Sequence, residues 1–182
     1  MKRVIIIFAL ALLALPAARA QNVAIKTNVA AWAAYGTTNL GVEAALWPRI
    51  TFNVDGFYNP WTFDNGKQSI FWAIQPELRL WFCRKFTGHF IGLHCGYADF
   101  DGGMQKYRYT GEMALGGLSY GYSLPLCKSW RLEANVGAGY RYASYDKTGS
   151  VHRPGDVVMY GHEASWTFGL TRGGLNIIYL IR

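Results

Sequence analysis

The amino-acid sequence predicts an all-β fold, an eight-stranded antiparallel up-and-down transmembrane β-barrel. Three observations lead to this prediction: apolar and polar side chains alternate with a period of two, short and long connections alternate along the chain, and aromatic residues gather at strand ends. A period of two places successive side chains on opposite faces of a strand. Beyond the N-terminal segment, no apolar run approaches the length of a membrane-spanning helix.

The N-terminal segment, residues 1–20, is predicted to be a cleaved secretory signal peptide. Lys2 and Arg3 give the positive start, Val4–Leu15 is the apolar run, and Ala18-Arg19-Ala20 is a small-x-small cleavage site. This apolar run is shorter than the roughly 20 residues that a spanning helix needs. We therefore expect residues 21–182 to form a single exported domain in the outer membrane of a Gram-negative bacterium.

The net charge and the cysteine residues argue against several classes of function. Loss of the signal peptide lowers the formal charge from +7 to +4, because it removes three basic residues and no acid. No clustered basic face then remains, so nucleic-acid binding is not expected. For Cys83, Cys95 and Cys127 we expect no disulfide, with Cys83–Cys127 the only plausible pair. No Cys/His spacing fits zinc, and no metal or cofactor is expected.

Eight segments with strand-like alternation follow one another, separated by turn residues. The expected strands cover residues 23–34, 40–46, 50–59, 69–83, 89–99, 112–124, 130–142 and 171–181. Connections after the second, fourth and sixth strands are short, whereas segments 60–68, 101–111 and 143–170 are long. Outer-membrane barrels have short periplasmic turns and longer outer loops. An even number of strands also lets the sheet close, which removes exposed edges from lipid.

The segment 69–83 has the clearest alternation. One face carries Ile70, Trp72, Ile74, Leu78, Leu80 and Phe82, and the other carries Gln75, Glu77, Arg79 and Trp81. Aromatic residues over the whole chain form two groups. Trp47, Trp81, Phe82, Phe86, Phe90, Trp130 and Tyr179 lie near the predicted lower rim, and Tyr35, Tyr58, Trp61, Phe71, Trp72, Tyr97, Tyr140 and Tyr142 near the upper. Such groups are typical of the aromatic girdles at the two membrane interfaces.

The predicted inward faces carry four positive and four negative side chains. They are Lys26, Arg79, Arg131 and Arg141 against Glu43, Asp55, Glu77 and Glu133. An eight-stranded barrel is narrow and is filled by side chains, and buried charges require partners. We therefore expect a closed interior held by salt bridges. Inward glycines at positions 92, 96, 121, 137 and 139 are expected to make room for the long side chains.

Four stretches resemble a family of exported Bacteroidota outer-membrane barrel proteins that carries a domain-of-unknown-function label. They are Asn59–Phe63, Gln75–Trp81, Cys83–His94 and Gly174–Ile181. The resemblance implies an outer-membrane barrel, encoded in some relatives near fimbrial genes, and it transfers no catalytic residue. In architecture the chain resembles the membrane domain of outer-membrane protein A. It departs from such barrels at its end, Leu180-Ile181-Arg182, where an aromatic residue is common.

We expect a structural, anchoring or surface-assembly role, associated with fimbriae as the resemblance implies, and no enzymatic activity. The expected partners are outer-membrane lipid and lipopolysaccharide, the barrel-assembly machinery, and surface or fimbrial proteins. A soluble periplasmic barrel with an apolar ligand inside is a third hypothesis, and the polar inward rows argue against it.

The alternative function is a lipid A-modifying hydrolase or acyltransferase with its site in the long outer loop. The candidate residues there are His152, Asp156, His162, Glu163 and Ser165. His94 falls on an inward face, and we expect it to be a hydrogen-bonded interior residue.

Overall fold

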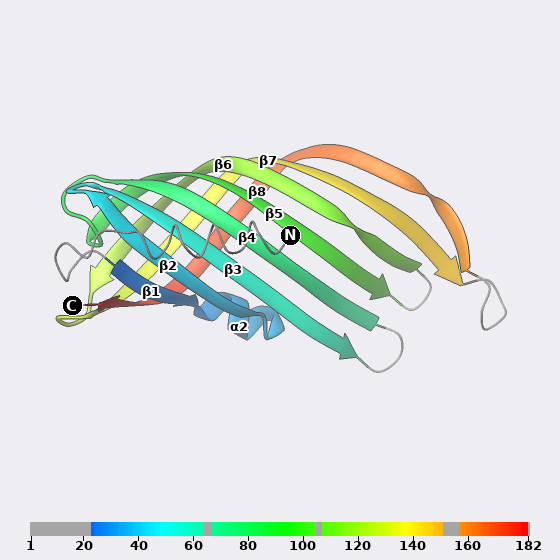
Figure 1. Cartoon of the computed structure of the whole chain (residues 1–182), viewed down its shortest axis with the longest axis horizontal. Helices are drawn as coiled ribbons and strands as arrows, with labels where there is room; N and C mark the ends of the chain where they lie inside the picture. The colour runs from blue at the N-terminus through cyan, green and yellow to red at the C-terminus, as the bar shows by residue number, and fades with distance from the viewer. Residues whose placement is uncertain (1–22, 64–66, 105–106, 151–156, 182) are drawn as a thin grey trace, which may run out of the picture.

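Eight strands form one closed antiparallel ring, in which each strand pairs with its neighbours in chain order and β8 pairs with β1 (Figure 1). The computed structural model describes residues 23–63, 67–104, 107–150 and 157–181. The strands are β1 (Val23–Asn28), β2 (Thr38–Trp47), β3 (Ile50–Phe63), β4 (Lys67–Trp81), β5 (Gly88–Met104), β6 (Tyr107–Pro125), β7 (Trp130–Ser150) and β8 (Val157–Ile181). The prediction of an all-β fold with eight antiparallel strands is confirmed. The predicted signal peptide lies outside the described residues.

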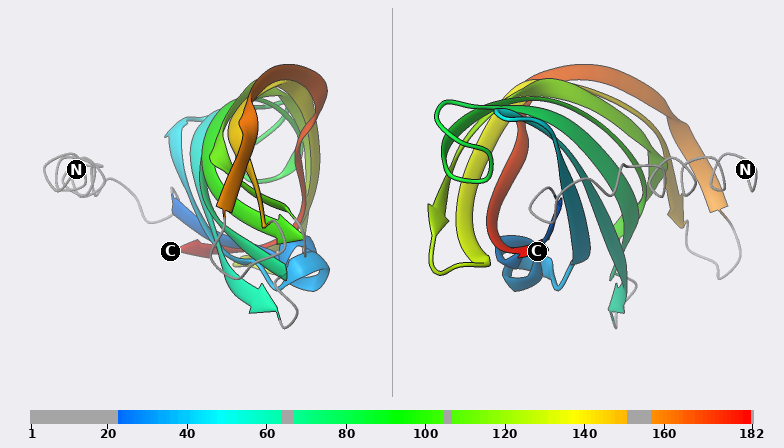
Figure 2. Two further views of the ribbon diagram at one scale, coloured as in Figure 1. Left: turned by 90° about the vertical axis from the view of Figure 1, so that its right-hand side faces the viewer. Right: turned by 60° about the vertical axis from the view of Figure 1, so that its left-hand side comes forward.

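The strands lengthen around the ring, from 6 residues in β1 to 25 in β8. We call the end at which Val23 pairs with Ile181 the lower end and the opposite end the upper end. β6, β7 and β8 arch past the ends of the shorter strands at the upper end (Figure 1). Figure 2 shows β8 and β1 side by side where the ring closes. The molecule is therefore a slanted ring whose last three strands rise furthest.

The first predicted strand, 23–34, is wrong in its second half, where the helix α2 (Val29–Tyr35) forms. The side chain of Asn28 caps this helix by accepting a hydrogen bond from the backbone N–H of Ala31 at 3.3 Å. Gly36 ends it with φ of 59°, in the left-handed region that glycine adopts easily. Four of the seven helical residues are alanine, the strongest helix former. Because small apolar residues fit either period, the sequence pattern did not distinguish helix from strand here.

The three predicted outer loops are wrong in extent, because the strands continue through most of them. β3 and β4 reach Phe63 and Lys67, β5 and β6 reach Met104 and Tyr107, and β7 and β8 reach Ser150 and Val157. Antiparallel pairing persists through these extensions, with Tyr145 opposite Glu163 as one example. Alternation is strong only where one face of a strand is buried. Many side chains in the extensions are exposed or half-buried, so their sequence lacks the pattern that predicted the lower strands.

Pairing between β1 and β8 runs upward as far as Asn28 opposite Asn176. Above this pair the chain enters α2, which packs beside β8 and β2. Asn28 Nδ2 donates to the carbonyl of Gly173 at 3.1 Å, and Trp61 Nε1 donates to the carbonyl of Gly36 at 3.0 Å. These two bonds attach both ends of the helix to β8 and β3, so α2 replaces strand pairing at this side of the ring.

Apolar side chains face outward from the ring and charged side chains face inward, which inverts the usual distribution in globular proteins. Leu118 on β6 is 68% exposed, whereas Arg79 on β4 is 0% exposed. The exposed large apolar side chains include Leu40, Phe52, Tyr58, Trp72, Leu78, Leu93, Tyr120, Val136, Tyr140, Phe168 and Leu175. The fully buried side chains include Thr51, Asn53, Glu77, Ser123 and Glu133.

All three cysteines, Cys83, Cys95 and Cys127, are free and exposed. Within the described ranges, no helix is both long enough and apolar enough to span a membrane.

Candidate functional site

The interior of the ring has three layers, and the inward row of β4 passes through all of them. From the lower end upward this row is Trp81, Arg79, Glu77, Gln75, Ala73 and Phe71. We name the layers the lower plug (Trp81, Phe86 and Phe90), the charge layer (Lys26, Glu43, Asp55, Glu77, Arg79, Glu133 and Arg172) and the upper chamber (Phe57, Phe71, Ala73, Ala98, Phe100, Met113 and Leu115). One strand therefore supplies aromatic, then charged, then apolar side chains to the same interior.

Arg79 is the centre of the charge layer. Its Nε donates to Glu77 at 2.5 Å, and its Nη1 donates to Glu43 at 2.8 Å and to Glu133 at 2.9 Å. A guanidinium offers five N–H donors in a planar fork, which suits it to several carboxylates at once. Phe90 lies under the same guanidinium, with the ring centroid 4.4 Å from Cζ. Arg79 thus connects three carboxylates from three strands and rests on the lower plug.

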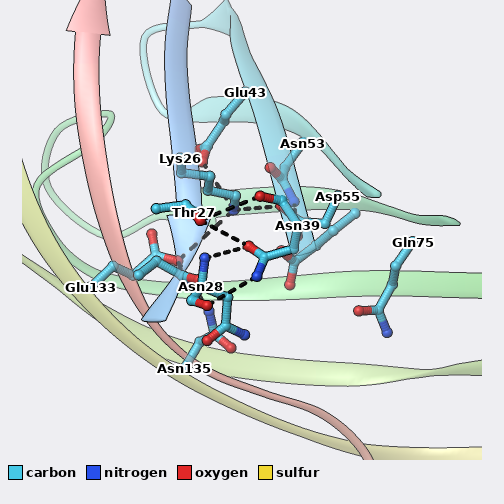
Figure 3. Close-up of polar contacts among 12 residues, drawn as sticks. Lys26, Thr27, Asn28, Asn39, Glu43, Asn53, Asp55, Gln75, Glu133 and Asn135 are labelled. Atoms are coloured by element: carbon cyan, nitrogen blue, oxygen red, sulfur yellow. Dashed lines mark hydrogen bonds and ion pairs between the residues drawn. The ribbon is translucent and has the colours of Figure 1, made fainter. Parts of the chain in front are cut away.

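Lys26 joins β1 to the same carboxylates. Its Nζ lies 3.7 Å from Glu43, 3.6 Å from Asp55 and 3.9 Å from Glu133 (Figure 3). These distances are ion pairs rather than close hydrogen bonds. A side chain at Gly41 would meet both Lys26 and Asp55, so this glycine makes room for the pair.

Arg172 on β8 completes the charge layer. It forms an ion pair with Asp55, lies 3.3 Å from Glu77, and donates from Nη1 to Gln75 Oε1 at 2.8 Å. The sequence prediction omitted Arg172, although the signal was present. Alternation of the apolar residues between 175 and 181 places position 172 on the same inward row as Asn176.

Six of the eight residues predicted for the interior charges meet in the charge layer: Lys26, Glu43, Asp55, Glu77, Arg79 and Glu133. Arg131 instead lies at the lower end, where its Nε donates to the carbonyl of Phe86 at 3.1 Å. Arg141 is half-buried opposite Leu115, at the height of the upper chamber. With Arg172 included, the layer joins three cations and four carboxylates, rather than the four and four expected.

The lower plug corrects the predicted lower aromatic girdle. Trp81, Phe86 and Phe90 are buried inside the ring, with ring centroids of Trp81 and Phe90 4.7 Å apart. Trp81 Nε1 donates to Thr51 Oγ1 at 2.8 Å, which satisfies the only polar group of the indole. Phe86 has φ of 61°, a left-handed conformation rare for a bulky residue. Trp47, Phe82, Trp130 and Tyr179 remain exposed at the lower end.

Inward glycines make room for the long side chains of the charge layer, as expected from the sequence for Gly92 and Gly137. A side chain at Gly92 would meet the hydroxyl of Ser119 and the carboxylate of Glu77, which hydrogen-bond to each other. A side chain at Gly137 would meet His94 and Arg172. Compact backbone at these positions lets the charged side chains approach from several strands.

The upper chamber departs from the prediction of uniformly polar inward rows. Its volume is about 360 Å³, and Phe57, Phe71, Ala73, Ala98, Phe100, Met113 and Leu115 line most of it. His94 lies just below, with Nε2 2.8 Å from Thr171 Oγ1, so it is a hydrogen-bonded interior residue, as expected. The interior is thus filled and charged below His94, and apolar and hollow above it.

A second polar cluster lies on the outer face of the upper extension of β7 and β8. Ser144 Oγ is 3.2 Å from His162 Nε2, and His162 Nδ1 is 2.8 Å from Asp146 Oδ1. These three side chains, which we name the outer triad, are joined in the order hydroxyl, imidazole, carboxylate. His162 is 62% and Asp146 46% exposed, so the triad is open to solvent or to an apposed molecule.

The predicted outer-loop residues are separated by the strand geometry. His162 and Ser165 are three apart on β8 and therefore point to opposite faces, so these two candidate residues do not form a pair. Glu163 also lies on the other face, where it accepts a hydrogen bond from Tyr145 at 2.7 Å. His152 and Asp156 lie outside the described residues. Sequence spacing could not reveal Ser144 and Asp146, because they reach His162 across the β7–β8 ladder.

The fold and its interior define the class: an all-β protein whose eight antiparallel strands form a ring around buried ion pairs. The chain belongs to the family described as Protein of unknown function (DUF3575), which it matches over residues 5–181. Neither a curated protein nor a solved structure matched it. Among the described residues, no group of three or more His, Cys, Asp or Glu side chains is placed to hold a metal ion.

Proposed function

We propose that the chain is a transmembrane β-barrel of a Gram-negative outer membrane, with a sealed interior and a structural, anchoring or surface-assembly role. The observation that carries this proposal is the inverted distribution of side chains, with apolar residues outward and ion pairs inward. Water would oppose such an exposed apolar surface on a soluble protein, because large exposed apolar patches promote association. A lipid environment removes that penalty.

The dimensions of the outward apolar band fit a bilayer. On β4 the exposed row runs from Trp72 to Leu80 and continues to Phe82 just beyond the strand. This stretch matches the roughly 9–11 residues that a tilted strand needs to cross the hydrocarbon core. Exposed aromatic residues stand at both of its ends, where girdle residues meet the lipid headgroups.

The filled interior favours a sealed barrel over a pore. The lower plug and the charge layer occupy the lumen with side chains bonded to one another, and the cavity beside Asp55 and Arg172 has a volume of only about 10 Å³. A cavity of that volume holds at most about one water molecule, so it provides no continuous aqueous path through this layer. The role proposed for the barrel is therefore attachment to the membrane. Lipid and lipopolysaccharide would be its surroundings, the barrel-assembly machinery would insert it, and surface or fimbrial proteins would be its partners.

Expression of the full chain in a Gram-negative host tests this proposal. We expect the processed protein in the outer-membrane fraction, solubilised only by detergent, with gel mobility that changes on heating as the barrel unfolds. In planar bilayers it should give no steady conductance. Recovery as a soluble periplasmic protein without detergent would contradict the membrane assignment, and stable ion channels would contradict the sealed interior.

A further inference from the structure

We propose that the outer triad, Ser144, His162 and Asp146, is a serine-hydrolase site that cleaves the acyl ester of a lipid at the outer membrane surface. The chemistry follows from the geometry of the three side chains. The substrate class also rests on the membrane placement proposed above.

The hydrogen bonds fix the tautomer of His162. A carboxylate accepts hydrogen bonds and donates none, so Nδ1, 2.8 Å from Asp146 Oδ1, carries the proton. Nε2 then presents its lone pair to the Ser144 hydroxyl, whose Oγ is 3.2 Å away. This is the arrangement in which an imidazole takes the proton of a serine nucleophile while the acid orients the ring. A distance of 3.2 Å suits a site without substrate, where such contacts are often longer.

The strand ladder and a bulge hold the triad together. Asp146 pairs with His162 across β7 and β8, and Ser144 is two residues from Asp146 on the same face of β7. The pairing register of β7 and β8 shifts directly above the triad, between Lys147 and Thr148. Gly161, the residue before His162, has φ of 142°. That φ lies in a region L side chains rarely adopt, and β-bulges often re-aim a side chain next to an active site. The bulge therefore sets the direction of the imidazole.

The surroundings of the triad indicate a lipid substrate. One row below it on the outer face are Tyr142 and Trp166, with ring centroids 5.1 Å apart, and Trp166 is 71% exposed. On the neighbouring strand β6, the exposed Thr110 lies opposite Asp146. The residues at the height of Asp146 are therefore polar, whereas the row below is aromatic. Aromatic residues of this kind settle at the boundary between acyl chains and headgroups. Ester carbonyls of membrane lipids lie at that boundary, so Ser144 is placed at their depth.

The reaction balances without a cofactor. Ser144 Oγ attacks the ester carbonyl carbon while its proton moves to His162 Nε2, and Asp146 stabilises the resulting imidazolium. The C–O bond to the lipid alcohol breaks, and that alcohol leaves with the proton. Water then attacks the acyl-serine by the same route and releases a carboxylic acid.

A fluorophosphonate probe and a micellar ester test the chemistry on the full chain in detergent, where no bilayer is needed. We expect the probe to attach to Ser144, located by peptide mass spectrometry. Ser144→Ala and His162→Ala should each lower hydrolysis of p-nitrophenyl octanoate about 1,000-fold or more, as loss of a nucleophile or its base does in serine hydrolases. Ser165→Ala is the matched control, because that hydroxyl faces away from His162, and it should retain full activity. Equal labelling of the Ser144→Ala protein, or no labelling of the parent, would overturn the proposal.

Lipid vesicles then test the substrate class. Release of fatty acid from phosphatidylethanolamine vesicles, or from lipopolysaccharide aggregates, would support it and identify the lipid. If the site hydrolyses soluble short-chain esters faster than either lipid, the lipid assignment is wrong. Failure of the barrel proposal would appear separately, as a protein soluble without detergent that still reacts with the probe.

Discussion

The charge layer and the upper chamber both include inward side chains of β3 and β4, yet the two layers are filled in opposite ways. In the charge layer the cavity beside Asp55 measures about 10 Å³, whereas the upper chamber measures about 360 Å³. On β4 the change occurs within a few residues, between Glu77 and Ala73. The pairing of the strands therefore does not by itself determine which side chains fill the interior.

The difference follows from what each kind of side chain needs. A buried charge must meet partners on all sides, so side chains converge on Arg79 from β2, β4 and β7. Apolar side chains need no charged or hydrogen-bonding partners, so a cavity among them leaves no buried charge unpaired. We infer that the charge layer holds and seals the ring, whereas the upper chamber can change without loss of the fold.

Arg79→Leu should have the largest effect. It leaves Glu43, Glu77 and Glu133 close together without their shared cation, and breaking a buried ion pair from one side destabilises a protein by about 3–5 kcal/mol. Urea unfolding in detergent micelles measures the loss. The matched control is Arg108→Leu, because the Arg108 side chain is 57% exposed where it pairs with Asp101. It should change stability by about 1 kcal/mol or less. Equal effects of the two substitutions would contradict the central role of Arg79.

Gly92→Ala should have the next largest effect. The added methyl group would meet Ser119 and lie 2.9 Å from the carboxylate carbon of Glu77. Overpacking of a filled interior destabilises by about 1–3 kcal/mol. Gly173→Ala is the control, because a Cβ at that position meets nothing within 4 Å. We expect the same unfolding assay to show no loss for the control, and a tolerated Gly92→Ala would mean that the charge layer is looser than described.

Ala98→Leu should have the smallest effect on stability. Ala98 lines the upper chamber, so the added atoms enter space that is already apolar. A change of about 1 kcal/mol or less is expected, because no packed side chain must move. The same variant should weaken binding of an apolar fluorescent probe such as N-phenylnaphthylamine, since it reduces the chamber. A loss of stability as large as that of Arg79→Leu would remove the distinction between the two layers.

Sequence alternation predicted the lower half of the ring well, because that half has one buried face. On β4 it placed Trp72 outward and Glu77 and Arg79 inward, as observed. It also contained two signals that the prediction did not use. Arg172 falls on the inward row of β8. Phe71 and Ala73 continue the inward row of β4 into the upper chamber, whereas the prediction assigned Phe71 to the upper aromatic group.

Other features could not be predicted from one sequence. The outer triad joins Ser144 and Asp146 to His162 across a strand pair whose register depends on a bulge. The upper extensions lack a buried face, so their polar residues resembled loops. The helix α2 depends on the cap at Asn28 and on the turn at Gly36, which compete with an equally apolar strand pattern.

The most direct test of the proposed barrel compares two outward positions on β6 by spin labelling. Leu118 lies in the apolar band and Thr110 lies beside the outer triad, about 27 Å away at about 3.4 Å per residue. With the three cysteines replaced by serine, nitroxides at these sites would be measured in lipid vesicles against oxygen and a water-soluble nickel chelate. We predict that the label at position 118 is accessible to oxygen and protected from nickel, and that the label at position 110 is accessible to nickel. Nickel access at both positions would contradict a membrane-spanning barrel.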